Sequence, residues 1–242
     1  MARYTSALKA STFIIFILTS WMNIFNRLAG YTRLDLKRRK DTPPMVLARE
    51  KYGRPSVTNL VETLSLPNTI GFLIARHPYE RLVSAYRDKI LEPKRHTIYD
   101  EISKHIIVRY RSQDKQPWDF KGFPPTFTEF VQYIIEQEDA GYEPDMHWAP
   151  VYSFCNPCQV RLTHIIKMET FDRDTKEILK KANLTKYIPS VQKRRLNISS
   201  GERSSSEAAQ TYLDQLPREL RKRLYNMYKI DMDLFGYEEE IL

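Results

Sequence analysis

The sequence predicts an α/β fold, a single domain in which helices flank a mainly parallel central sheet. Residues 69–75 form a nearly continuous apolar run, which is typical of a parallel strand buried on both faces. Residues 161–169 form a second strand-like stretch around His164-Ile165-Ile166. Segments with apolar residues at helical spacing lie before, between and after these stretches, as an α/β chain requires.

Before the first strand, the pattern predicts a helix that ends at Gly30 and a short helix from Ser56 to Leu64, closed by Pro67. The first of these carries its apolar side chains at helical spacing, on Trp21, Ile24, Phe25 and Leu28. Residues 33–45 are polar and basic, so we expect a solvated loop there.

After the first strand, the periodicity predicts five helices. They cover residues 79–91, 98–111, 128–139, 172–181 and 206–228. Leu82, Val83 and Tyr86 supply the inner face of the first. We expect Thr128 and Asp172 to cap the helices that they begin, because short polar side chains satisfy free backbone N–H groups.

The composition restricts the choice of ligand. The chain has seven glycines in 242 residues, and none is placed for the common dinucleotide or Walker phosphate loops. A net charge of +8 favours an anionic partner, such as nucleic acid, a phosphorylated cofactor, an acidic glycan or a membrane surface. Nucleic-acid binding would rest on charge alone because no reader module is recognisable, so we expect no such partner.

The chain contains two cysteines, in the motif Cys155-Asn156-Pro157-Cys158. His147 and His164 flank the pair at distances that do not suit a zinc site, so we expect no metal. A short structural disulfide and a pair of buried thiols are the two interpretations of this motif.

The N-terminal segment is uncharged from residue 10 to residue 26 and has a dense apolar core at 13–18. Basic residues including Lys9 precede it, as they precede a signal or anchor. A signal anchor and a buried core segment both fit this hydropathy. We therefore separate an apolar segment, residues 1–20, from a domain that comprises residues 21–242.

Arg76 follows the first strand directly, and a helix begins at Pro78. This order places a cation and a helix N-terminus at the carboxyl edge of the sheet, where α/β folds bind ligands and where phosphate is favoured. Arg76 can bind phosphate oxygens in a bidentate manner, and Ser84 could donate to the same group two turns into the helix. The alternative is a capped helix with a surface ion pair.

Three blocks of sequence resemble one family. Residues 74–89, IARHPYERLVSAYRDK, closely resemble the 3′-phosphate-binding motif of Golgi carbohydrate sulfotransferases, in the branch with the chondroitin, dermatan and HNK-1 enzymes. Residues 145–170, with DMHWAP, CNPC and IKMET, resemble its mid-domain signature, and residues 224–237 resemble its closing helix and tail. The resemblance extends from about Trp21 to Tyr237.

The resemblance implies a P-loop-like sulfotransferase fold and transfer of a sulfuryl group from 3′-phosphoadenosine 5′-phosphosulfate (PAPS) to a glycan hydroxyl. It implies that Arg76 and Ser84 hold the 3′-phosphate. The family's second cofactor motif cradles the 5′-phosphosulfate with a lysine and backbone amides. Here Lys9 resembles its beginning, and Thr19 and Ser20 resemble its end.

The apolar residues 13–18 separate the two halves of that motif, and its loop glycine is missing. The insertion is a gene-model or splicing artefact, a membrane anchor that continues into the domain, or a genuine loop. We favour the first, because a loop would expose six large apolar residues at a cost of about 2 kcal/mol each. The interruption also leaves open a non-catalytic relative that binds acidic glycans.

Sulfuryl transfer needs cations at the donor and a base for the acceptor hydroxyl. His147 is the expected base, because a neutral imidazole has a suitable pKa, although it could merely be packed in the core. Lys9 is the second catalytic candidate. Glu80 is a weaker one, expected instead to form an ion pair with Arg81 or Arg87.

The resemblance also implies a glycan acceptor, an acidic polysaccharide, and a Golgi membrane protein of single-pass type II topology with a lumenal catalytic domain. The sequons at Asn183 and Asn197 agree with a lumenal location. Basic runs at 37–40, 193–195 and 221–223 could hold the acidic acceptor, or each could be a solvated face.

Overall fold

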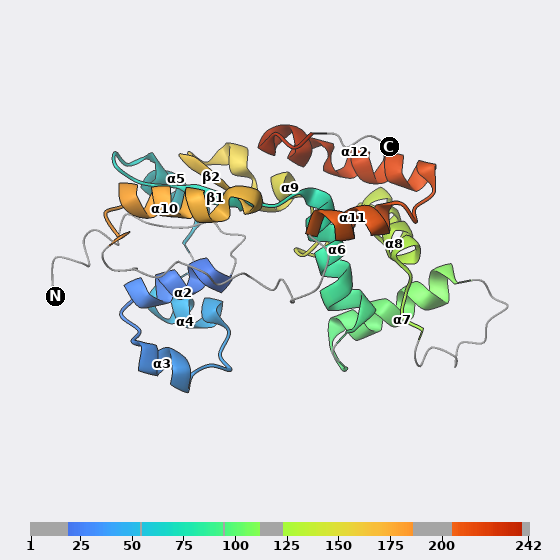
Figure 1. The fold of residues 1–242 in the computed structure, drawn as a ribbon, viewed down its shortest axis with the longest axis horizontal. Coiled ribbons are helices and arrows are strands. Elements are labelled where there is room, and N and C mark those ends of the chain that lie inside the picture. Colours follow the sequence, from blue (N-terminus) through green and yellow to red (C-terminus); the bar gives the residue numbers. More distant parts are fainter. Residues whose placement is uncertain (1–18, 54, 94, 112–122, 186–204, 239–242) are drawn as a thin grey trace. The chain divides into compact units, whose positions relative to one another are not determined.

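The computed structural model describes residues 19–53, 55–93, 95–111, 123–185 and 205–238 (Figure 1). The chain forms two compact units, each built from two stretches of sequence. The first unit comprises residues 1–75 and 155–194, and the second comprises residues 76–154 and 195–242.

The first unit contains a parallel pair of strands, β1 (Phe72–Ala75) and β2 (His164–Lys167), in which Phe72 lies opposite His164 and Ala75 opposite Lys167. All four residues of β1 are buried, as its apolar run predicts. These are the two strands of the described residues, so the α/β class is confirmed, with a small parallel sheet in a mostly helical chain. The described residues contain no larger, mainly parallel central sheet of the kind predicted.

Gly71 permits the close approach that starts this pairing. Its carbonyl oxygen accepts hydrogen bonds from the backbone N–H and the hydroxyl of Thr163, at 2.8 and 2.9 Å. A Cβ atom at position 71 would lie 2.9 Å from the carbonyl oxygen of Arg161 and 2.7 Å from a methyl group of Leu64. A larger residue here would therefore push the two segments apart.

Helices surround this sheet in the first unit. They are α2 (Thr19–Leu28), α3 (Arg33–Arg38), α4 (Pro44–Lys51), α5 (Val57–Ser65), η3 (Pro157–Gln159), η4 (Met168–Thr170) and α10 (Phe171–Lys181). The core of the unit includes Trp21, whose ring centroid lies 4.5 Å from that of Phe72 and 5.6 Å from that of Phe25. The helices predicted to end at Gly30 and to cover 56–64 and 172–181 are confirmed as α2, α5 and α10, and the Ser56 hydroxyl caps α5.

Residues 33–45 are solvated as predicted, but they include α3 and the start of α4 on either side of a turn at 39–43. Thr32 accepts a hydrogen bond from the Asp35 N–H, while the Asp35 carboxylate accepts one from the Thr32 N–H, so a capping box starts α3. Pro44 occupies the first turn of α4, where its missing N–H costs nothing. Capping chemistry therefore produces helices in a segment too polar to show an apolar stripe.

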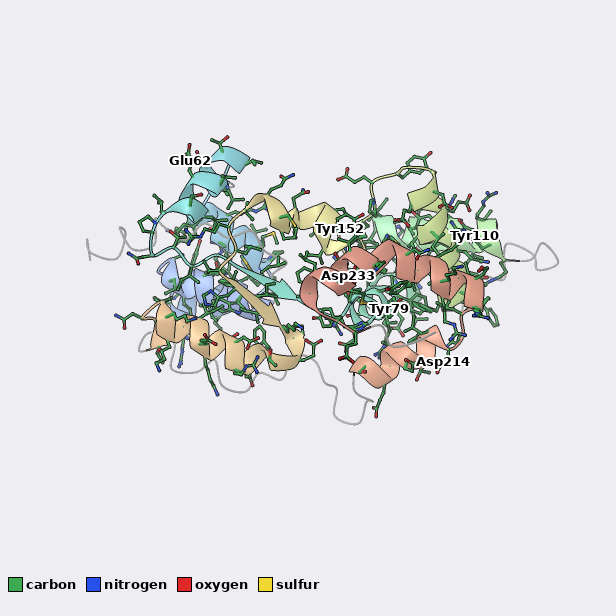
Figure 2. The ribbon with its side chains drawn as sticks, turned by 90° about the horizontal axis from the view of Figure 1, so that it is seen from above. Glu62, Tyr79, Tyr110, Tyr152, Asp214 and Asp233 are labelled. Carbon is green, nitrogen blue, oxygen red and sulfur yellow. The ribbon has the colours of Figure 1, made fainter. Side chains whose placement is uncertain are left out.

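The second unit is built from helices. They are α6 (Pro78–Ala85), η1 (Tyr86–Leu91), α7 (Ile98–Tyr110), α8 (Phe127–Asp139), α9 (Val151–Cys155, which ends in the first unit), α11 (Ser205–Leu213) and α12 (Arg218–Phe235). Tyr79 on α6, labelled in Figure 2, packs edge-on against Tyr228 on α12, with ring centroids 6.3 Å apart. The predicted inner residues Leu82, Val83 and Tyr86 are all buried in this core.

Three predicted helix features are wrong, two in the second unit and one, at α10, in the first. Thr126, and not Thr128, caps α8, because its hydroxyl accepts from the Glu129 N–H. Helix α10 has no side-chain cap, and Asp172 lies within its first turn. The single helix predicted at 206–228 is two helices, because Pro217 has no backbone N–H and its ring restricts the preceding residue.

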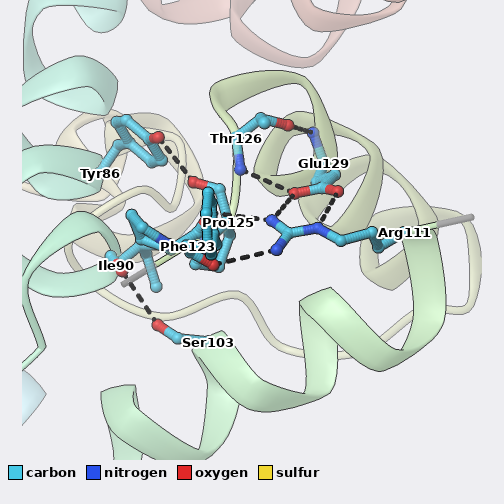
Figure 3. A network of polar contacts seen from close by, with 9 residues as sticks. Tyr86, Ile90, Ser103, Arg111, Phe123, Pro125, Thr126 and Glu129 are labelled. Carbon is cyan, nitrogen blue, oxygen red and sulfur yellow. Dashed lines mark hydrogen bonds and ion pairs between the residues drawn. The ribbon is translucent and has the colours of Figure 1, made fainter. Parts of the chain in front are cut away.

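A network around Arg111 fixes the start of α8 (Figure 3). The guanidinium pairs with the Glu129 carboxylate at 3.0 Å and donates to the carbonyl oxygens of Phe123 and Pro124. Glu129 also accepts from the backbone N–H of Thr126, completing a capping box. This mostly buried pair therefore holds the chain that enters the helix.

The two cysteines correspond to neither predicted interpretation. They are not joined in a disulfide, and Cys155 is buried whereas Cys158 is exposed. Asn156 between them has a left-handed backbone, with φ of 44°, and Pro157 starts the turn of η3 that carries Cys158 outward. This reversal separates the environments of two residues that lie three positions apart.

Within the described residues, no helix is both long and apolar enough to cross a membrane. The apolar run 13–18, Lys9, the basic run 193–195 and the Asn197 sequon all lie outside the described residues.

Candidate functional site

The predicted order of strand, cation and helix is present. β1 ends at Ala75, Arg76 and His77 follow, and α6 begins at Pro78. His77 caps α6, because its Nδ1 accepts from the Tyr79 N–H at 3.3 Å. The protonated nitrogen of the His77 ring is therefore Nε2 when the ring is neutral.

Arg76 is held on one side only. Its Nε lies 3.4 Å from Glu80 Oε2, and the hydroxyl of Ser205, at the start of α11, donates to the same oxygen at 2.7 Å. Glu80, which the sequence analysis expected to form an ion pair with Arg81 or Arg87, thus forms one with Arg76. The two Nη atoms of Arg76 make no hydrogen bond to another described residue, so their edge can receive two oxygens of an anion.

Ser84 lies on α6, two turns beyond Arg76, and is half-buried. Its hydroxyl makes no hydrogen bond within the described part of the chain. Serine in a helix interior commonly bonds the carbonyl one turn back, so a hydroxyl without that bond is a donor still available to a ligand. Arg76 and Ser84 therefore keep the donors that a phosphate needs.

Helix α6 continues into a wider π-helical turn, η1. Turns of this kind are uncommon and often occur at functional sites. This one carries Lys89, whose ammonium lies over the Tyr99 ring, 5.3 Å from its centroid. Tyr99 in turn contacts the predicted base.

His147 is held by two side chains. Its Nδ1 lies 2.6 Å from Asp145 Oδ1 and 3.0 Å from the Tyr99 hydroxyl, and its backbone N–H also donates to Asp145 Oδ1, at 2.8 Å. The Tyr99 hydroxyl donates to the other carboxylate oxygen, Asp145 Oδ2, at 3.2 Å. The His147 Nε2 atom has no hydrogen bond to a described residue.

The charges of this cluster follow from its contacts. Burial acts to raise the pKa of Asp145, but the hydrogen bonds from the ring and the N–H of His147 outweigh it and hold that pKa below its ordinary value of 3.8. Burial, then the neighbouring Asp145 charge, raises the pKa of Tyr99 to about 12. At neutral pH, Asp145 is therefore an anion and Tyr99 a neutral hydroxyl.

Arg81 connects α6 to this cluster. Its guanidinium donates to the carbonyl oxygen of His147, at 3.1 Å, and to that of Ala149. The Tyr228 hydroxyl donates to the carbonyl of Trp148 between them. Helix α6, which carries Ser84 and begins two residues after Arg76, therefore also fixes the backbone that carries His147.

Asp231 on α12 completes the support of this loop. It is fully buried, and its two oxygens accept from the N–H groups of Val151 and Tyr152, at 2.6 and 2.8 Å. These are the first two amides of α9, which have no partner within their own helix. Burial raises the pKa of Asp231, and these hydrogen bonds oppose the rise without cancelling it.

The remaining predicted residues are only partly described. Lys9 lies outside the described residues, and Thr19 and Ser20 are the first residues of α2, with only their backbone described. Sequence reasoning missed the roles of Asp145, Tyr99 and Arg81. The spacing of Asp145 and His147 was a usable signal, whereas the position of Tyr99, 48 residues away, was not. In the described segments no group of three or more His, Cys, Asp or Glu side chains could hold a metal ion.

A cation and a hydroxyl with unused donors thus lie at the start of α6 and within it, and the same helix is bonded to the backbone of a histidine that contacts a carboxylate. The chain belongs to the sulfotransferase family, whose model matches residues 17–238.

Curated proteins agree. The chain is 28% identical over 227 residues to carbohydrate sulfotransferase 11 of Rattus norvegicus, covering 90% of this chain and 61% of that protein. It is 32% identical over 226 residues to carbohydrate sulfotransferase 8 of Mus musculus, covering 91% and 52%. It is 31% identical over 196 residues to carbohydrate sulfotransferase 12 of Xenopus laevis, covering 77% and 44%. The match thus spans about half the length of these relatives. No solved structure matches the chain significantly.

Proposed function

We propose that this protein transfers a sulfuryl group from PAPS to a hydroxyl of a glycan. The observation that carries the proposal is the double role of α6. Arg76 lies two residues before this helix and Ser84 lies on it, both with unused donors, and through Arg81 the helix binds the backbone of His147. The names of the relatives, all carbohydrate sulfotransferases, support a sugar acceptor.

The residues present fit a phosphate at this helix. Arg76 would bind the 3′-phosphate of PAPS through its two Nη atoms, and Ser84 would donate its hydroxyl. Glu80 holds Arg76 through Nε and leaves those donors available. PAPS, when bound, supplies the sulfuryl group and a phosphate leaving group. Lys9, Thr19 and Ser20 remain our proposal for the 5′-phosphosulfate.

His147 is the proposed base. Its Nε2 would accept the proton of the acceptor hydroxyl as the oxygen bonds to sulfur, which avoids a positive charge on that oxygen. The Asp145 anion would stabilise the imidazolium that results, as a buried carboxylate does in hydrolase triads. Lys9 stays a proposal as a second catalytic residue.

We further propose that residues 21–242 form the sulfotransferase domain and that it acts in the Golgi lumen, attached to the membrane. The family model matches residues 17–238, which include nearly the whole of that range, and this supports the first point. An acidic polysaccharide is the proposed acceptor, which a net charge of +8 would attract.

Calorimetric titration with 3′-phosphoadenosine 5′-phosphate tests the donor site. Wild-type protein should bind it, and Arg76→Ala should weaken binding at least about tenfold, since a charged hydrogen-bonded pair contributes 1.5–3 kcal/mol. Lys104→Ala is the matched control, because Lys104 is an exposed cation that pairs with Asp100 and Glu101 on its own helix. No binding by the wild-type protein would contradict the enzyme proposal.

Transfer of labelled sulfate from PAPS to desulfated polysaccharides tests the activity itself. His147→Ala should lose turnover and keep nucleotide binding, if its role is confined to the acceptor proton. A protein that binds polysaccharide but neither binds nucleotide nor transfers label would be the non-catalytic relative that the interrupted 5′-phosphosulfate motif suggests.

A further inference from the structure

The contacts of His147 constrain its ring beyond what a role as a base alone would require. Asp145, Tyr99 and His147 make four polar contacts with one another, one of them from the His147 backbone N–H, and three of the four end on the Asp145 carboxylate. The rings of Tyr99 and His147 are nearly perpendicular, at 87°, with centroids 5.6 Å apart. Such a cluster constrains both the ring's orientation and its proton.

The short contact settles which nitrogen carries that proton. A carboxylate oxygen only accepts, so a separation of 2.6 Å from Nδ1 requires a proton on Nδ1. Asp145 cannot supply it, because its lowered pKa keeps the carboxyl ionised at neutral pH. With Nδ1 protonated, Nε2 of the neutral ring holds the lone pair.

Tyr99 fits the same assignment. Its hydroxyl has one proton, which it donates to Asp145 Oδ2, and it then faces Nδ1–H with its oxygen. The Tyr99 ring is itself fixed, edge-on to Trp148 at 6.4 Å and beneath the Lys89 ammonium. Tyr99, which lies on α7, therefore holds the Asp145 carboxylate in place, although α7 is far from His147 in the sequence.

We propose that Asp145 and Tyr99 are positioning residues that hold His147 in the tautomer protonated at Nδ1, so that Nε2 is the atom that accepts the acceptor's proton. This inference rests on the proposed function, because it assigns the orientation of the base proposed there. Asp145 fixes the tautomer, and Tyr99 fixes the carboxylate.

Nitrogen-15 NMR of the His147 ring tests this in the protein without ligand. Each spectrum is followed through a pH titration to the neutral form, and the signal is assigned by its loss in His147→Gln. The wild type should show the Nδ1–H tautomer, and Tyr99→Phe should keep it, because Asp145 remains. Asp145→Ala should shift the ring to Nε2–H, because the Tyr99 hydroxyl then donates to Nδ1.

The matched control is Glu143→Ala, an exposed carboxylate two residues from Asp145, which should leave the tautomer unchanged. An Nε2–H tautomer in the wild type would overturn the inference, whatever the variants show. So would an Nδ1–H tautomer that persists in Asp145→Ala.

The result is separable from the proposed function. If wild-type protein shows Nδ1–H but transfers no sulfate, the enzyme proposal fails and the ring assignment stands. If it transfers sulfate with an Nε2–H ring, the assignment alone fails. In an active enzyme, Asp145→Ala should lower kcat at least about a hundredfold and leave KM for PAPS within about twofold, by analogy with loss of the carboxylate in a triad.

Discussion

Arg81 donates a hydrogen bond of 3.1 Å from Nη1 to the backbone carbonyl of His147, which is 66 residues further along the chain. Its Nη2 donates to the carbonyl of Ala149. A loop segment without regular secondary structure thus has two of its backbone acceptors satisfied by one side chain of a helix. Because buried carbonyls need such partners, the loop's conformation depends on this helix.

We expect Arg81→Met to lower the free energy of unfolding by about 2–3 kcal/mol, because two carbonyl oxygens lose a charged donor. The His147 ring signals should also move. Urea unfolding followed by circular dichroism measures the first effect. Arg223→Met is the control, since Arg223 pairs only at the surface with Asp139 and should cost less than about 1 kcal/mol.

Glu80 opposes anion binding, because it places a carboxylate beside Arg76. Glu80→Gln keeps an oxygen for Arg76 Nε and for the Ser205 hydroxyl but removes the negative charge. We expect it to tighten binding of 3′-phosphoadenosine 5′-phosphate about three- to tenfold, since like charges several ångströms apart near a surface repel by about 1 kcal/mol. Weaker binding in calorimetry would show that the charge of Glu80 is needed to hold Arg76.

Arg109 and Arg111 are neighbours that should differ sharply in their contribution to stability. The Arg111 side chain is 16% exposed and its partner Glu129 12%, whereas Arg109 and Glu136 are 59% and 43% exposed. We expect Arg111→Met to cost about 3 kcal/mol, because it leaves a mostly buried carboxylate unpaired. Arg109→Met should cost less than about 1 kcal/mol. Equal losses in urea unfolding would contradict the role of the network in Figure 3.

Local patterns predicted most elements. The apolar run before Arg76 forms β1, and the periodic segment at 98–111 forms α7. In both, the pattern of apolar residues follows from which side chains are buried. Errors arose where a cap or a single proline decides the outcome. Thr32 and Asp35 make a helix from a polar segment, and Pro217 divides an unbroken apolar register.

The site was predictable where its chemistry is contiguous in sequence. Arg76 directly precedes the cap of the helix that carries Ser84, so spacing alone related them. The support of His147 was not predictable, because Tyr99 and Arg81 reach it across 48 and 66 residues. Such contacts depend on how helices pack, which periodicity does not determine.

The Asp145 contacts predict a pH dependence of stability. Because its pKa is lower in the folded chain than the ordinary 3.8, the ionised carboxylate stabilises the fold. That contribution is complete above the unfolded value and is lost as the pH falls through the lower folded value. The difference in unfolding free energy between wild type and Asp145→Ala should therefore narrow as the pH falls below roughly pH 4.

Asp231 works in the opposite direction, since burial raises its pKa and its contribution falls as the pH rises. It is present in both proteins, so it cancels in their difference. Glu143→Ala, which removes an exposed carboxylate nearby, should show a difference from wild type that does not narrow with acidification. If the Asp145→Ala difference were equally flat, the carboxylate would have the same pKa in both states. The hydrogen bonds from His147 would then not stabilise its charge, and the assignment of the ring proton to Nδ1 would lose its electrostatic support.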